Sequence, residues 1–163
     1  MSYRFIPQLD DADIRRQQEE GLANTLARVW NSPQYAGKLR ACGLKPGDLI
    51  GLDDLARLPT VDVDDLREGY PLPLLCVPPT DVVRIHASSG TTGKRKILAY
   101  TAADVDTFNL QMARCYELAG LTAEDRMQIA VGYGLWTAGV GFQGGSEKLG
   151  MLTVPGGPGN LEV

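Results

Sequence analysis

Histidine is almost missing from this chain: among its 163 residues only His86 can supply an imidazole. A Ser-His-Asp triad or a histidine-based zinc site therefore has little to draw on, and we expect His86 to be a strand residue satisfied by backbone groups. The three cysteines, at positions 42, 76 and 115, are odd in number, far apart and without metal-type spacing. They are expected to be buried or free thiols in a reducing compartment. The sequence assigns no catalytic residue and no metal ligand.

Long apolar runs and an excess of basic charge are absent too. No stretch reaches membrane-spanning length and the first residues, MSYRFIPQLDD, contain no long apolar region, which favours a cytoplasmic protein without a membrane partner. The 16 Lys and Arg against 20 Asp and Glu give a net charge of −4, which argues against nucleic acid as the main partner. A hydrophobic content of 44% over this length is sufficient for the core of one domain.

The first eighty residues have the pattern of a helical segment. Apolar side chains recur at helical spacing, and polar caps and prolines divide the segment into short helices before a proline-rich connector. The predicted elements are a helix around 22–30 capped by Asp10 or Asp11, a helix from Pro33 to Gly43, helical turns over 52–58, a helix capped by Asp62, and a connector over 71–79.

From residue 81 strands and helices alternate, which implies a mostly parallel sheet covered by helices. The apolar stripe on the central helix is expected to pack in the core; its members are Val105, Phe108, Met112, Cys115 and Tyr116. The predicted elements are strands over 82–85 and 97–100, a helix from a Thr101–Asp104 capping box to Gly120, a strand over 127–131, a helix over 137–149 and a strand over 151–155. We therefore predict an α/β fold, with a helical segment at 1–80 and a partial α/β subdomain at 81–163.

Residues 88–96 read SSGTTGKRK, which places two glycines, four hydroxyl side chains and three cations between two predicted strands. Backbone N–H groups freed by glycine, hydroxyl donors and lysines all suit a phosphate chain, whereas a simple turn is the alternative. The P-loop spacing is not met, because Ser88 stands where its first glycine would be and Lys94 is followed by Arg95. A strand rather than a helix follows, so we expect a phosphate-binding loop of another kind.

A second candidate lies where the strand over 127–131 ends. Gly132 and Gly134 allow a sharp turn that carries Tyr133 and Trp136. Ligands bind at the carboxyl ends of strands in helix-covered parallel sheets, so this turn is a candidate site. The alternative is a tight turn whose aromatic side chains fill the core.

The stretch 84–94, RIHASSGTTGK, strongly resembles the phosphate loop of the phenylacetate–CoA ligase family, within the adenylate-forming superfamily. Counterparts follow in the family's order over almost the whole chain: Pro59, Asp65-Leu66-Arg67, Tyr70-Pro71, Tyr100-Thr101 and Gly132-Tyr133-Gly134-Leu135. The resemblance implies that the chain forms part of the large amino-terminal domain of an adenylate-forming enzyme. Such an enzyme makes an acyl-adenylate from a carboxylic acid and ATP with Mg²⁺, and coenzyme A then takes the acyl group as a thioester.

By the same resemblance, two groups of residues are assigned to ligands. The residues expected to hold the ATP phosphates are Ser88, Ser89, Gly90, Thr91, Thr92, Gly93, Lys94 and Lys96. Those expected to line the pocket for the acid are Tyr133, Gly134 and Trp136. The expected substrate is an aryl or arylacetic acid, and phenylacetate is the favoured one. Adenylation of a deazaflavin coenzyme by a related synthetase, and a non-catalytic remnant that acts as a binding module, are the alternatives.

The chain departs from the family pattern at four positions and in length. Arg95 replaces a proline, Val63 a lysine, Val131 an aromatic residue and Trp136 a phenylalanine. Family members are much longer, so we expect an amino-terminal fragment, inactive alone, whose partner is the carboxyl-terminal part of the same protein. The oligomeric state is left open, with a homodimer among the alternatives.

Overall fold

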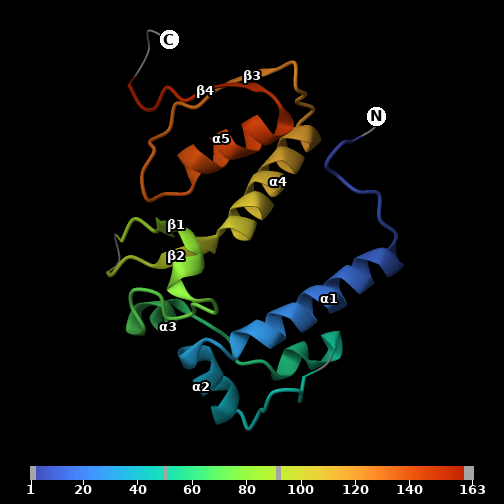
Figure 1. The fold of residues 1–163 in the computed structure, drawn as a ribbon, viewed down its shortest axis with the longest axis vertical. Helices are drawn as coiled ribbons and strands as arrows, with labels where there is room; N and C mark the ends of the chain where they lie inside the picture. The colour runs from blue at the N-terminus through green and yellow to red at the C-terminus, as the bar shows by residue number, and fades with distance from the viewer. Residues whose placement is uncertain (1–2, 50, 91–92, 160–163) are drawn as a thin grey trace. The chain divides into compact units, whose positions relative to one another are not determined.

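The computed structural model describes residues 3–49, 51–90 and 93–159 (Figure 1). By backbone contacts these residues divide into two compact units, which are treated separately below. Unit 1 takes its residues from 1–7, 83–91 and 98–163, and unit 2 from 8–82 and 92–97. The division at residue 80 that the sequence suggests remains a prediction. No helix in the described ranges is long and apolar enough to cross a membrane.

Unit 2 contains short helices that begin where their caps predict. The carboxylate of Asp10 accepts a hydrogen bond from the Asp13 amide at 2.8 Å, and the Asp62 carboxylate accepts from the Asp65 amide at 3.1 Å. These contacts satisfy amide groups that the first helical turn leaves without partners. The predicted caps are confirmed. The helical elements are α1 (Asp11–Val29), α2 (Pro33–Ala41), the 3₁₀ turns η1 (Leu52–Arg57) and η2 (Pro79–Asp81), and α3 (Val63–Glu68).

Buried polar contacts tie α2 to α3. Asp65 is only 7% exposed, and its carboxylate pairs with the Lys38 ammonium, which also donates to the Thr60 carbonyl at 3.1 Å. Gln34 donates from its amide to the Asp65 carbonyl at 2.7 Å. The hydrogen bond from Lys38 lowers the pKa of Asp65, and the same bond raises the pKa of Lys38. The first turn of α3 is thus held to α2 through one acidic residue.

Unit 1 contains two small sheets rather than one continuous sheet. The strands β1 (Val82–Ala87) and β2 (Ile97–Thr101) pair with each other, and β3 (Arg126–Gln128) pairs in parallel with β4 (Leu152–Val154). The register of the parallel pair sets Met127 opposite Thr153. Within the described residues, the expected mostly parallel sheet is therefore limited to the β3–β4 pair, because β1 and β2 pair with each other instead.

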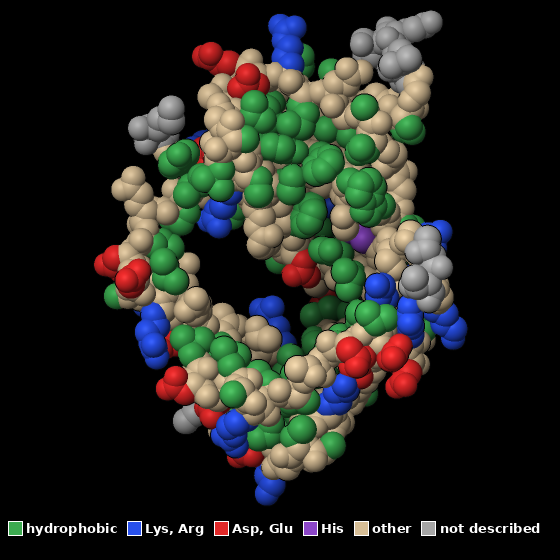
Figure 2. Space-filling model, turned by 180° about the vertical axis from the view of Figure 1, so that it is seen from behind, with side chains coloured by type: hydrophobic (Ala, Val, Ile, Leu, Met, Phe, Trp, Pro, Cys, Tyr) green, Lys and Arg blue, Asp and Glu red, His purple; other side chains and the backbone are tan. Residues whose placement is uncertain are grey.

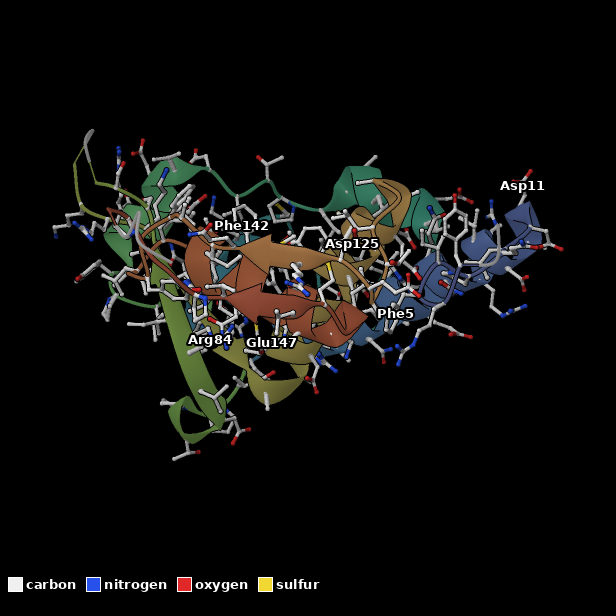
Figure 3. All side chains as sticks on the ribbon, turned by 90° about the horizontal axis from the view of Figure 1, so that it is seen from above. Phe5, Asp11, Arg84, Asp125, Phe142 and Glu147 are labelled. Carbon is white, nitrogen blue, oxygen red and sulfur yellow. The ribbon has the colours of Figure 1, made fainter. Side chains whose placement is uncertain are left out.

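The helices α4 (Ala102–Leu118) and α5 (Ala138–Leu149) pack closely in unit 1 (Figure 1). Glycines on α5 make this approach feasible, because a methyl group at Gly141 or Gly145 would overlap Phe108 or Met112 of α4. The Tyr116 hydroxyl of α4 also donates to the carbonyl of Phe142, which Figure 3 labels, at 3.2 Å.

The core of unit 1 lies beside this helix pair. Its buried members are Ala113, Leu149 and Met151, and the partly buried Phe5, labelled in Figure 3, packs against them. Further partly buried members are Tyr116, Leu121 and Met127. The predicted apolar stripe is wrong at Cys115, which is exposed, because the helix turns Ala113 rather than Cys115 into the core.

The predicted strands over 127–131 and 151–155 are shorter in the structure. Pairing continues one step past β3, since the Ile129 amide donates to the Val154 carbonyl at 2.8 Å and the Ile129 carbonyl accepts from Gly157 at 2.9 Å. Beyond Ile129 the chain turns toward Gly132 and Gly134. The strand therefore stops before Val131.

Candidate functional site

The upstream arm of the hydroxyl-rich loop leaves β1 in unit 1. His86 and Ala87 at the end of β1 are buried, whereas Ser89 is exposed and Ser88 and Gly90 are half-buried. Gly90 has a φ of 74°, a left-handed conformation that glycine adopts without steric cost. The strand ends at Ala87 and the loop begins there, as predicted. Thr91 and Thr92, which the sequence also assigns to the phosphates, lie outside the described residues.

A single carbonyl joins the end of β1 to the turn over 132–136. The Ala87 amide donates to the Leu135 carbonyl at 2.7 Å, and Nδ1 of His86 lies 3.2 Å from the same oxygen. The edge of the Tyr100 ring also meets the His86 ring, with 5.2 Å between centroids. His86 is therefore buried and satisfied by a backbone group, as the sequence predicts. More importantly, the residue before Ser88 is hydrogen-bonded to the aromatic turn, so the upstream arm of the loop and the aromatic turn are adjacent within unit 1.

The aromatic side chains of this turn face outward. Tyr133 is 40% exposed and Trp136 is 60% exposed, and apolar side chains gather on the surface of unit 1 in Figure 2. These exposed fractions contradict the alternative in which the aromatic residues fill the core. Partial burial, followed by the carboxylate of Glu147 (labelled in Figure 3), raises the pKa of the Tyr133 hydroxyl.

The first turn of α5 packs directly against the backbone of the aromatic turn. A Cβ atom at Gly139 would lie 2.7 Å from the Gly132 carbonyl oxygen and 3.3 Å from the Cα of Tyr133. Real Cβ atoms do not approach a backbone oxygen this closely, so only glycine fits at this position. The backbone that carries Tyr133 is thereby held against a helix.

The downstream arm of the loop belongs to unit 2. Gly93, Lys94 and Arg95 are exposed and Lys96 is half-buried. Gly93 has a φ of 132°, which strongly favours glycine. The ammonium of Lys94 lies 5.8 Å from the ring centroid of Tyr70. The sequence predicts no ligand contact for Tyr70, although Tyr70-Pro71 was among the stretches that carried the family resemblance.

The described residues contain no group of three or more His, Cys, Asp or Glu side chains placed to hold a metal ion. The donors of the candidate site are instead amide, hydroxyl and ammonium groups, which suit an anion.

Solved structures define the class of protein to which this architecture corresponds. The chain aligns with 2-hydroxyisobutyryl-CoA ligase in complex with 2-HIB-AMP and CoA at a TM-score of 0.82 and 27% identity, over 94% of this chain and 34% of that one. An open conformation of the same ligase aligns at a TM-score of 0.81 and 24% identity, which shows the fold alone. The fold is that of part of an adenylate-forming CoA ligase. No protein-family model matches the chain.

Curated relatives then identify the group within that class. The chain is 40% identical to phenylacetate-coenzyme A ligase of Pseudomonas putida over 150 residues, which are 91% of this chain and 34% of that protein. It is 43% identical to the enzyme of the same name from Thermus thermophilus over 143 residues, 87% of this chain and 32% of that protein. The resemblance seen in the sequence is confirmed. Most of this chain is homologous to phenylacetate-CoA ligases, and it spans about a third of their length.

Proposed function

We propose that this chain is part of an acid–CoA ligase that activates an aryl or arylacetic acid, with phenylacetate favoured, as an acyl-adenylate and transfers it to coenzyme A. The observation that carries the proposal is the Ala87–Leu135 hydrogen bond of 2.7 Å. It sets the start of the phosphate loop beside the turn that would meet the acid, and adenylation requires the acid carboxylate and the nucleotide phosphates to meet.

The loop would contribute to this reaction by positioning and by electrostatics. Attack of a carboxylate on the α-phosphorus of ATP releases pyrophosphate, so the charge on the β and γ phosphates has to be held and neutralised. Exposed Ser89 and Lys94 can reach a ligand from solvent. We assign the phosphate grip to Ser88 through Lys94 together with Lys96, in which backbone amides, hydroxyls and ammonium groups act without any proton transfer.

The aromatic turn would select the acid. Tyr133 and Trp136 offer exposed aromatic surface, and no atom lies within 4 Å of the Cβ position of Gly134 between them. Burial of an aromatic ring contributes about 2–3 kcal/mol, so a ring-bearing acid is favoured over acetate. Trp136 takes more space than the phenylalanine of the family pattern, whereas Val131 takes less space than the aromatic residue it replaces. The pocket would therefore differ in shape rather than simply be smaller.

Acid-dependent exchange of pyrophosphate into ATP by the complete protein tests the proposal. We expect exchange with phenylacetate and other aryl acids and little exchange with acetate, in the presence of Mg²⁺. Exchange that only a deazaflavin coenzyme supports would replace the acid by that coenzyme. No exchange with any acid would favour a non-catalytic binding module and refute the proposal.

A further inference from the structure

The end of α3 contacts the downstream arm of the loop within unit 2. The guanidinium of Arg67 lies against Gly93: its Cζ and Nη2 atoms are 3.6 Å, and its Nε atom 3.8 Å, from the point where a Cβ on Gly93 would be. Three atoms at nearly the same distance place the guanidinium plane face-on to this glycine. The guanidinium therefore faces the side of Gly93 on which other residues carry a side chain, at a distance where an added methyl group would make ordinary van der Waals contact.

A second contact lies one residue further along the loop and three residues after Arg67. The Lys94 ammonium lies 5.8 Å from the Tyr70 ring centroid, within the range of a cation–π interaction. The Tyr70 amide donates to the Arg67 carbonyl at 3.3 Å, so the turn after α3 fixes the spacing of the two side chains. Arg67 and Tyr70 thus face the consecutive loop residues Gly93 and Lys94.

The element that carries Arg67 is itself anchored. Asp65 of α3 pairs with Lys38, its carbonyl accepts from Gln34, and its carboxylate accepts from the Asp62 amide at 2.9 Å. Arg67 also meets the exposed Asp64 carboxylate at 3.4 Å, a surface pair that contributes little. A short helix fixed in this way can serve as a rigid support for a loop.

We propose that Arg67 is a positioning residue for the phosphate loop: its guanidinium covers the side of Gly93 that has no side chain, and it keeps a second positive charge next to Lys94. The charge contribution rests on the proposed function, whereas the packing contribution does not. A triphosphate held by the loop would then interact with two cations, Lys94 directly and Arg67 behind the glycine.

The test uses tripolyphosphate as the probe and Arg67→Gln as the variant, with Arg16→Gln as its matched control. Arg16 makes the same kind of Asp–Arg pair three residues apart on a helix, with Asp13, but lies on α1. Arg67→Lys retains the charge without the planar group and keeps the test informative if Arg67→Gln fails to fold. The two readouts are the amide NMR signals of Gly93 and Lys94 and the tripolyphosphate dissociation constant.

We expect Arg67→Gln to shift both amide signals and to raise the dissociation constant about fivefold, while Arg67→Lys raises it less and Arg16→Gln leaves both readouts unchanged. Unshifted amide signals would overturn the proposal. If Arg67→Gln shifts the amide signals but leaves the tripolyphosphate dissociation constant unchanged, while Lys94→Gln raises that constant, the role of the Arg67 charge would be overturned. If the unmodified protein fails to bind tripolyphosphate although the signals shift, the proposed function fails while the packing role of Arg67 stands.

Discussion

Replacement of Gly139 by alanine probes the support beneath the aromatic turn. The new Cβ would lie 2.7 Å from the Gly132 carbonyl oxygen and 3.3 Å from the Cα of Tyr133. Both contacts involve backbone atoms, so relief requires a shift of the turn or of the first turn of α5. The substitution is therefore expected to perturb the fold of unit 1 and the placement of Tyr133 together.

The magnitude follows from two opposing contributions. Overpacking of a close contact costs about 1–3 kcal/mol, whereas alanine in place of a helical glycine gains up to about 1 kcal/mol. We expect a net loss of about 1–2 kcal/mol in the free energy of unfolding. Gly37 of α2 is the matched control, because it is also helical but has no atom within 4 Å of its Cβ position. Gly37→Ala should increase stability by about 0.5–1 kcal/mol.

Urea unfolding followed by tryptophan fluorescence measures both variants. The sequence has two tryptophans, Trp30 in unit 2 and Trp136 in unit 1. A Trp30→Phe background therefore reports on Gly139→Ala through the aromatic turn, and a Trp136→Phe background reports on Gly37→Ala through unit 2. We expect Gly139→Ala to lower the midpoint and to alter the emission of the folded state, because Trp136 lies in the displaced turn. A midpoint that rises as it does for Gly37→Ala would refute the reasoning.

Three further substitutions test other contacts. Thr101→Ala removes the cap of α4, whose hydroxyl accepts from the Asp104 amide at 3.2 Å, and should cost about 1 kcal/mol in urea unfolding; an unchanged midpoint would contradict the capping role. Trp136→Ala should raise the KM for the acid, spare the KM for ATP and change stability by less than about 0.5 kcal/mol, since the side chain is 60% exposed; a variant that loses only stability would show a structural role. Because pairing lowers the pKa of Asp65 below its ordinary 3.8, its stabilising effect is present above that pH and disappears as the pH falls through the lowered value. The stability difference between the unmodified chain and Asp65→Asn should therefore be constant from about pH 5 to 8 and begin to fall once the pH drops below 3.8. A difference that does not decrease below that pH would exclude the pairing with Lys38 as its source.

The elements of the fold that depend on local chemistry could be predicted from the sequence. Asp10, Asp62 and Thr101 each cap a helix within three residues of themselves, and a capping pattern is legible without tertiary information. The paired strands on either side of the loop were predictable for the same reason. The exposed Cys115 was not, because the stripe on α4 is set by which face α5 covers.

Contacts between distant parts of the sequence could not be derived from the pattern. Ala87 and Leu135 are joined by a hydrogen bond across almost fifty positions of sequence, and nothing in either stretch specifies the other. The support of Gly93 by Arg67 is of the same kind, since it depends on how α3 is anchored by Lys38. The sequence named the candidate loop and turn, while their placement required the structure.

Acid-dependent pyrophosphate exchange by a Lys94→Ala variant of the complete protein tests the central claim, that the loop over 88–96 holds ATP phosphates. Lys45→Ala is the control, because Lys45 is an exposed lysine on a different turn. We expect Lys94→Ala to raise the KM for ATP about tenfold or more, the effect of one lost charge-assisted contact. The KM for the acid and the melting temperature of Lys94→Ala should stay the same. Lys45→Ala should change neither KM value nor the melting temperature. A KM for ATP that is unchanged in Lys94→Ala would contradict the account.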